Sequence, residues 1–186
     1  HVDWKRRTVS VVEEVGRGAS RWSSSGLGWG LSRELAQAMR AVLLGADPPV
    51  DVSRRALGML ARLREEWGSR VDETSMVLEG GEVLWTFIGE AVNRSLVAAL
   101  HRLGVDARAD SLAVRCHQPI TVSRVRDAGV LLGGSDPPAP AVDQRLLDGL
   151  KFSVALPVEV ARAELQARAG DAEGAAEVGN AKARVL

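Results

Sequence analysis

The chain has 186 residues, of which 46% are hydrophobic and 26% are charged. This composition is typical of a globular protein large enough to bury a core, and it argues against a disordered chain. Basic and acidic side chains balance at 24 each, which excludes a strongly basic nucleic-acid-binding protein. The apolar runs are too short to span a bilayer, so we expect no membrane partner.

The charges are unevenly distributed along the chain. Residues 1–70 carry 12 basic and 8 acidic side chains, a balance of +4, whereas residues 71–186 carry 12 and 16, a balance of −4. Any contact with a polyanion is therefore expected in the first third of the chain. The single cysteine, Cys116, cannot form an internal disulfide and is interpreted as a buried apolar thiol in a reducing compartment. The absence of an initiator methionine predicts that the chain is part of a longer protein.

The first thirty residues combine a predicted hairpin with an irregular loop. "RRTVSVVEEV" alternates as a strand does, and "HVD" before it is expected to be its partner. Residues 16–30 are rich in glycine and serine and predict no regular structure. Arg6, Arg7, Arg21 and Trp22 join guanidinium groups to an indole, a chemistry suited to phosphate contact and base stacking. The alternative is that Trp22 packs under the loop as part of the core.

Two amphipathic helices are predicted next, with Ser32 as N-cap of the first. The buried stripe of this helix is expected to contain Leu31, Leu35, Met39 and Val42. In the second helix, "VSRRALGMLARLREEWG", we expect the buried side to contain Leu57, Leu60, Ala61 and Trp67.

A hairpin turning at Gly80-Gly81 follows, and its second strand runs into another helix. The inner face of that helix is expected to contain Val92, Leu96, Ala99, Leu100 and Leu103. "VDARADSLAVRCH", residues 105–117, predicts strand structure, most clearly at residues 112–116, and Thr121 is expected to cap a short helix. The lack of regular strand–helix alternation favours an α+β fold of short antiparallel strands and packed amphipathic helices.

Three segments are expected from these elements. Residues 1–132 form the α+β domain, incomplete at its N-terminus, and residues 133–145, which include "GGSDPPAPA", form a loop or linker. Residues 146–186 form a C-terminal helical segment that packs on the same domain.

Catalytic motifs are not found in the sequence. It has no phosphate-binding G-x-x-x-x-G-K-[ST] and no G-x-S-x-G elbow. Three histidines and one cysteine lack the spacing of a structural zinc site, and acidic pairs such as Glu65-Glu66 are interpreted as surface charge. We therefore assign no catalytic residue and no metal ligand.

"EVLWTFIGEAVNRSLVAAL" nevertheless resembles a known signature, the W-W-T-F-A-G-x-x-A-N-x-x-L-A-x-x-L segment of Lhr-type helicases. These are large helicase-related proteins of superfamily 2, with DEAD/DEAH-box motors. The matching positions are Trp85, Thr86, Phe87, Gly89, Asn93 and Leu96. The positions that differ are Leu84, Ile88 and Val92. Segments near residues 2–57 and 150–178 resemble the same region of those helicases in the same order.

The resemblance implies an accessory domain of an ATP-dependent 3′–5′ DNA helicase with a role in DNA repair. Its motor and winged-helix domains would lie upstream, together with ATP and Mg²⁺, so no cofactor is expected in this chain. The partners would be single-stranded DNA or RNA:DNA hybrids, in a cytoplasmic, nucleoid-associated location. Trp85, Phe87 and Asn93 are expected to be structural, and Arg21 and Trp22 are the better candidates for nucleic-acid contact. The alternative is a structural or protein-interaction domain that does not touch nucleic acid.

Overall fold

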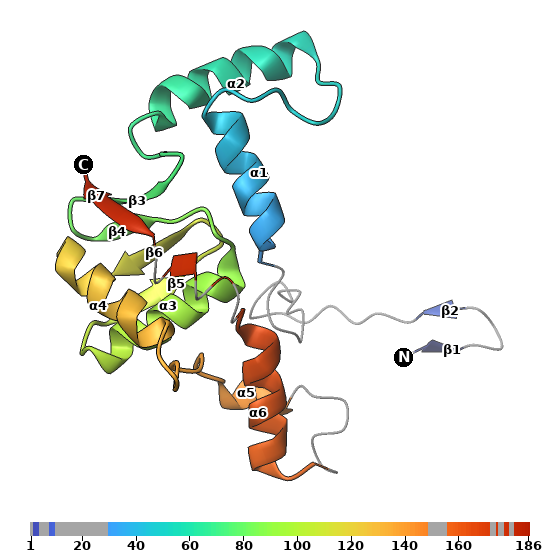
Figure 1. Ribbon diagram of the computed structural model, residues 1–186. Coiled ribbons are helices and arrows are strands. Elements are labelled where there is room, and N and C mark those ends of the chain that lie inside the picture. Colours follow the sequence, from blue (N-terminus) through green and yellow to red (C-terminus); the bar gives the residue numbers. More distant parts are fainter. Residues whose placement is uncertain are drawn as a thin grey trace, which may run out of the picture.

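The computed structural model describes residues 2–3, 8–9, 30–148, 156–171, 174, 177–178 and 181–186. Within them, a five-stranded sheet of order β5-β6-β4-β3-β7 forms the centre (Figure 1). Only the β3–β7 pair is parallel among these strands, so the sheet is mostly antiparallel and the predicted α+β class is confirmed. The strands of this sheet are β3 (Ser75–Glu79), β4 (Val83–Trp85), β5 (Ala107–Ala109), β6 (Ala113–Cys116) and β7 (Lys182–Val185).

Two short strands near the N-terminus pair separately. β1 (Val2–Asp3) and β2 (Thr8–Val9) are antiparallel, as the sequence pattern predicts. The described helices are α1 (Arg33–Leu43), α2 (Arg54–Trp67), α3 (Glu90–Arg102), α4 (Val122–Leu132), α5 (Gln144–Asp148) and α6 (Val158–Ala169).

Helices α3 and α4 pack on one face of the sheet and enclose the larger core. Leu84 of β4 and Leu96 of α3 have no exposed surface in this core. Burying a leucine side chain contributes roughly 1.5–3 kcal/mol. The predicted inner face of α3 is confirmed, with Leu103 half-buried at its edge. Thr121 caps α4 as predicted, since its Oγ1 accepts a hydrogen bond from Arg124 N.

The other sheet face carries a smaller aromatic cluster. Trp67 from the end of α2 meets Trp85 edge-on, with 4.8 Å between ring centroids, and lies 6.4 Å from Phe87. Edge-to-face contacts of this kind add to the hydrophobic gain of burial. The cluster attaches the C-terminal end of α2 to the sheet.

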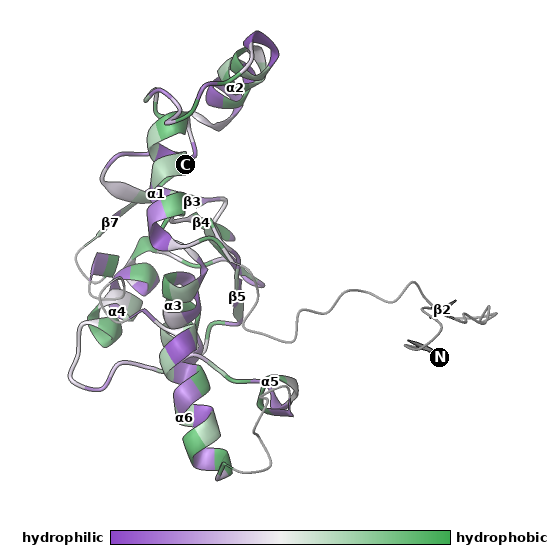
Figure 2. Ribbon diagram, turned by 90° about the vertical axis from the view of Figure 1, so that its right-hand side faces the viewer, coloured by the Kyte–Doolittle hydropathy of each residue, from purple (hydrophilic) through white to green (hydrophobic). Residues whose placement is uncertain are grey.

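Helices α1 and α2 otherwise project from the sheet as an arm (Figures 1 and 2). The predicted buried stripes are wrong here, because α1 buries only Ala36 and α2 buries no side chain. Leu35 is 50% exposed and Leu57 is 47% exposed. Both helices are amphipathic, but their apolar faces turn toward no other element of the described chain except near their ends.

The last strand was not expected from the sequence. Within residues 146–186, α6 is a helix, whereas α5 begins two residues earlier, in the segment expected to be a loop. Residues 146–186 also contain β7, which pairs with β3 in register Val77↔Arg184. "KARV" has little intrinsic strand preference, since alanine and lysine are depleted in strands. Its pairing with a buried strand imposes the extended conformation.

A tight turn joins β4 to α3 and requires unusual backbone angles. Phe87 has φ +54° and Gly89 has φ +86°. A Cβ on Gly89 would lie 2.8 Å from Arg33 N and 3.0 Å from Leu31 O. Only glycine therefore allows the segment before α1 to pass this close to the start of α3.

We predict that Gly89→Ala lowers the free energy of unfolding by more than about 2 kcal/mol, because backbone strain and a backbone clash act together. Gly104→Ala is the matched control, since Gly104 has φ +78° but no atom within 4 Å of the added Cβ. Urea denaturation of both variants measures the difference. Equal losses in the two variants would show that the contact with the α1 segment is unimportant.

Candidate functional site: the strand–helix corner

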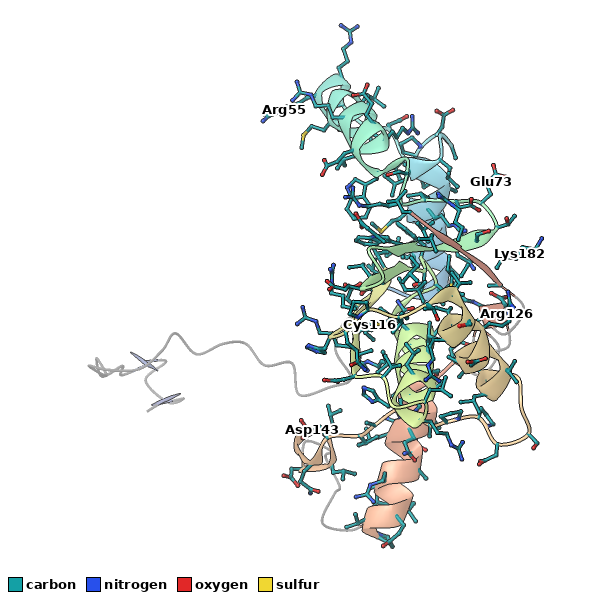
Figure 3. The ribbon with its side chains drawn as sticks, turned by 90° about the vertical axis from the view of Figure 1, so that its left-hand side faces the viewer. Arg55, Glu73, Cys116, Arg126, Asp143 and Lys182 are labelled. Carbon is teal, nitrogen blue, oxygen red and sulfur yellow. The ribbon has the colours of Figure 1, made fainter. Side chains whose placement is uncertain are left out.

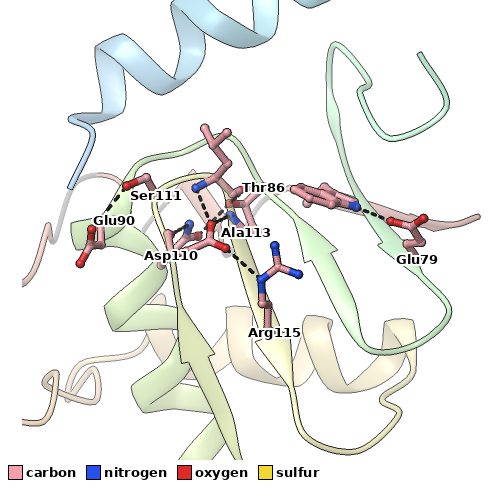
Figure 4. A network of polar contacts seen from close by, with 10 residues as sticks. Glu79, Thr86, Glu90, Asp110, Ser111, Ala113 and Arg115 are labelled. Carbon is pink, nitrogen blue, oxygen red and sulfur yellow. Dashed lines mark hydrogen bonds and ion pairs between the residues drawn. The ribbon is translucent and has the colours of Figure 1, made fainter. Parts of the chain in front are cut away.

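The signature residues predicted from the sequence lie at the corner where β4 ends and α3 begins. Figure 4 shows the polar contacts around Thr86 at this corner. Directly after β4, two consecutive backbone N–H groups donate hydrogen bonds to the same carbonyl oxygen. Thr86 N and Phe87 N lie 2.9 Å and 3.0 Å from the carbonyl oxygen of Leu112. This double contact fixes the corner to the loop that precedes β6.

A buried polar link joins the corner to α3. The Thr86 hydroxyl donates to Asn93 Oδ1 at 2.8 Å, and Asn93 Nδ2 donates to the carbonyl oxygen of Asp110 at 2.8 Å. Thr86 is 1% exposed and Asn93 is fully buried. Because an unpaired buried amide costs about 1–3 kcal/mol, this geometry accounts for an asparagine inside α3. Asn93 thus connects the end of β4 and the loop before β6 through its side chain.

Asp110 extends the link to the sheet surface. Its Oδ1 accepts hydrogen bonds from Leu112 N and Ala113 N at 2.9 Å and 2.8 Å. Its Oδ2 accepts from Arg115 Nε at 3.1 Å. The Arg115 guanidinium carbon lies 5.6 Å from the centre of the Trp85 ring, a cation–π distance.

The Trp85 indole is held by a carboxylate on the neighbouring strand. Trp85 Nε1 donates to Glu79 Oε2 at 2.7 Å, and Arg70 Nε and Nη2 donate to the same carboxylate at 2.8–3.0 Å. Hydrogen bonds from Arg70, and then from Trp85, lower the pKa of Glu79. The indole is therefore fixed at both its ring face and its polar edge.

The segment just before α1 is hydrogen-bonded to the same corner. Leu31 N donates to Ser111 Oγ at 3.0 Å, and Glu90 N donates to the Leu31 carbonyl oxygen at 3.1 Å. Ser111 Oγ also donates to Glu90 Oε2 at 3.4 Å. Leu31, Glu90 and Ser111, which are far apart in the sequence, are therefore hydrogen-bonded to one another at this corner.

The buried polar side chains of the corner all have hydrogen-bond partners. The described residues contain no buried side-chain nitrogen or oxygen without a hydrogen-bond partner. Cys116 is buried, as predicted, and burial raises the pKa of its thiol. In the described ranges, no three histidine, cysteine or acidic side chains are grouped as metal ligands would be.

The site residues predicted from the sequence divide into two sets. Trp85, Thr86, Phe87, Gly89 and Asn93 come together at the corner, where all five are buried. The four candidate nucleic-acid contacts, Arg6, Arg7, Arg21 and Trp22, lie outside the described residues.

The sequence analysis did not identify a pair of arginines on the sheet face that carries the aromatic cluster. Arg108 of β5 lies directly opposite Arg115 of β6. Arg108 is exposed, and no carboxylate in the described part of the chain pairs with it. Cross-strand like charges are destabilising. The alternation of residues 107–116 could have suggested two strands, but only the register brings these two positions together.

Comparison of the chain with protein-family models, curated proteins and solved structures gives no match. Function is therefore inferred from the residues and geometry of this chain. None of the helices within the described ranges combines the length and apolarity needed to cross a membrane.

We predict that Glu79→Gln makes the free energy of unfolding less dependent on pH in the acidic range. The pKa of Glu79 is lowered in the folded state, so its stabilising effect is present above the ordinary value of 4.5 and is lost as pH falls through the folded pKa. The wild-type free energy of unfolding should therefore fall more steeply below pH 4.5 than that of Glu79→Gln.

Denaturant unfolding at a series of pH values measures this difference. Glu82→Gln, an exposed carboxylate in the same hairpin, is the matched control and should keep the wild-type slope. Identical slopes for wild type and Glu79→Gln would contradict the assigned role of Glu79.

Proposed function

We propose that the chain is an accessory domain of an Lhr-type, ATP-dependent 3′–5′ DNA helicase. In this role it helps to bind or enclose single-stranded DNA while upstream motor domains, with ATP and Mg²⁺, separate DNA duplexes or RNA:DNA hybrids. DNA repair is the process in which such an activity would serve.

The observation that carries this proposal is the geometry of the matched signature. The polar and glycine residues of the match each have a specific structural reason. Thr86 and Asn93 form the buried hydrogen-bonded link, and Gly89 permits the close approach of the segment before α1. The three positions that differ are Leu84, Ile88 and Val92, which are apolar packing residues. These exchanges change side-chain volume but keep each position apolar, whereas the polar and glycine positions of the signature are retained. This pattern supports a shared fold as the basis of the resemblance.

Two features support contact with a nucleic-acid strand. Residues 1–70 carry the balance of +4 and include Arg21 and Trp22. On the sheet face that carries Trp85, Arg108 lies opposite Arg115, and while Asp110 pairs with Arg115, no carboxylate of the described residues pairs with Arg108, so its guanidinium is available to a phosphate. Guanidinium groups beside an indole suit both phosphate contact and base stacking.

The alternative is a structural or protein-interaction domain of the same helicase. The balance of −4 in residues 71–186 favours it, as does the complete hydrogen bonding of the corner. In that case the domain would affect unwinding only through its contacts with the motor or winged-helix domains.

We predict that Arg21→Ala combined with Trp22→Ala weakens single-strand binding by about tenfold or more, because one phosphate contact and one stacked base are lost. The slope of binding against salt should decrease by roughly 1 in magnitude. Fluorescence anisotropy of a labelled oligonucleotide with the full-length protein measures both quantities.

Arg126→Ala is the matched control, since Arg126 is an exposed arginine on α4 (Figure 3). This change should leave the affinity unaltered. Unchanged binding and unwinding in the double variant would overturn the assignment of Arg21 and Trp22. A change in stability or domain docking alone would favour the alternative.

A further inference from the structure

Helix α2 carries three exposed arginines around one glycine. Residues three and four positions apart are neighbours on a helix surface. Arg54 and Arg55 therefore lie one turn before Gly58, and Arg62 lies one turn after it. Residues 54–62 contain no acidic side chain. We call the surface formed by Arg54, Arg55, Gly58 and Arg62 the α2 patch.

The arginines of the α2 patch have no ion-pair partner within the described part of the chain. Arg70, just beyond the helix, differs in this respect, because it pairs with Glu79 at 2.8 Å. The first turn of α2 also lacks an acidic residue, although this is the helix end where negative charge is favoured. Contacts among the described residues therefore do not explain why these three positions are arginine.

Gly58 is not explained by packing or by backbone conformation. Glycine destabilises a helix interior relative to alanine. A Cβ on Gly58 would meet no atom within 4 Å, so the fold leaves room for a side chain at this position. Its φ also lies outside the left-handed region. The effect of the glycine is to leave the helix backbone open between the surrounding guanidinium groups.

We propose that the α2 patch binds the phosphate backbone of a single nucleic-acid strand. Guanidinium groups match phosphate oxygens in geometry and charge. Arg55 and Arg62 lie seven residues apart on one side of the helix, about 10 Å along its axis, so they contact different phosphates. Gly58 allows the strand to approach the helix between them. This inference rests on the proposed function, and it adds the arm to the contact assigned to Arg21 and Trp22.

The position of α2 permits this contact. The helix lies at the far end of the arm, and Arg55 projects from it away from the sheet (Figure 3). Arg64 fixes α2 to the end of α1, because its Nε donates to Val42 O at 2.8 Å and its Nη2 donates to Ala46 O at 2.7 Å. The helix is therefore held in place before a strand arrives, and binding has to order only the arginine side chains.

A phosphate backbone fits the α2 patch better than an acidic protein surface does. Protein interfaces are centred on buried apolar or aromatic side chains, whereas the residue at the centre of the patch, Gly58, has no side chain. Glu65 and Glu66 follow Arg62 by about one turn, and their charge would repel phosphates. The strand is therefore expected over the first half of α2.

We expect the combined Arg54→Gln, Arg55→Gln and Arg62→Gln variant of the 186-residue chain to bind a labelled oligodeoxythymidine about tenfold or more weakly than wild type. The slope of log affinity against log salt concentration should decrease by about 2 in magnitude, since each phosphate contact on a single strand contributes about 0.7. Fluorescence anisotropy at several salt concentrations measures both quantities.

The matched control combines Arg124→Gln, Arg126→Gln and Arg162→Gln, which removes the same charge from exposed arginines of α4 and α6. This control should keep the wild-type affinity and slope. Wild-type binding by the α2 variant, or an equal loss in the control, would overturn the assignment to α2 and leave the proposed function standing. A wild-type chain that binds no oligonucleotide at about 50 mM salt would overturn both this inference and the proposed strand contact.

Substitution of Gly58 tests the same site without removing an arginine. Gly58→Glu and Gly58→Gln should not lower the urea midpoint, because both new residues favour a helix more than glycine does. Gly58→Glu should bind the oligonucleotide at least about tenfold more weakly than Gly58→Gln, since its carboxylate would pair with the neighbouring arginines and repel phosphate. Equal affinities of the two variants would contradict the proposal. Displacement of the oligonucleotide by polyglutamate of matching charge at the same concentration would assign the patch to an acidic protein, and the proposal would be wrong.

Discussion

The hydrogen-bonded link from Thr86 through Asn93 to Asp110 is the interaction on which the rest of the described structure depends. It is buried, it spans three elements, and it satisfies every polar group that it brings out of water. Without it, the Asn93 amide would be unpaired inside the core, and the Thr86 hydroxyl would keep only the Leu112 carbonyl oxygen as an acceptor. Buried networks of this kind favour one arrangement over alternatives, because a partly satisfied network is costly.

The same corner sets the positions of the peripheral elements. The α1 segment is bonded to Glu90 and Ser111 beside the link, and Trp67 at the end of α2 packs on Trp85 and Phe87. The arm therefore leaves the sheet in a direction determined by the corner, while most of its apolar side chains remain in solvent. The corner thus holds the base of an arm whose outer apolar side chains, such as Met59 and Leu63, are exposed.

Local signals in the sequence predicted the elements whose conformation is determined locally. The Gly80-Gly81 turn, the Thr121 cap and the apolar spacing of α3 each depend on neighbouring residues, and the structure has all three. Non-local features were not predictable in this way. The strand β7 exists because it pairs with β3, and the contact of Arg108 with Arg115 across two strands depends on register. For α2, amphipathicity predicted the helix but not whether its apolar side would be covered within the described chain. The role of Asn93 was predictable in kind, whereas its partner Asp110 was not.

A double-mutant cycle of Thr86→Val and Asn93→Leu, followed by chemical denaturation, tests the central link most directly. Thr86→Val leaves Asn93 Oδ1 without its donor and should cost about 1–3 kcal/mol. Asn93→Leu removes the donor to the Asp110 carbonyl oxygen, while the Thr86 hydroxyl can still donate to Leu112 O at 3.1 Å. The double change removes both groups of the Thr86–Asn93 bond. The two losses should therefore be less than additive, with a coupling energy of about 1 kcal/mol or more. Additive losses, or single losses near zero, would show that the link does not hold the sheet and α3 together.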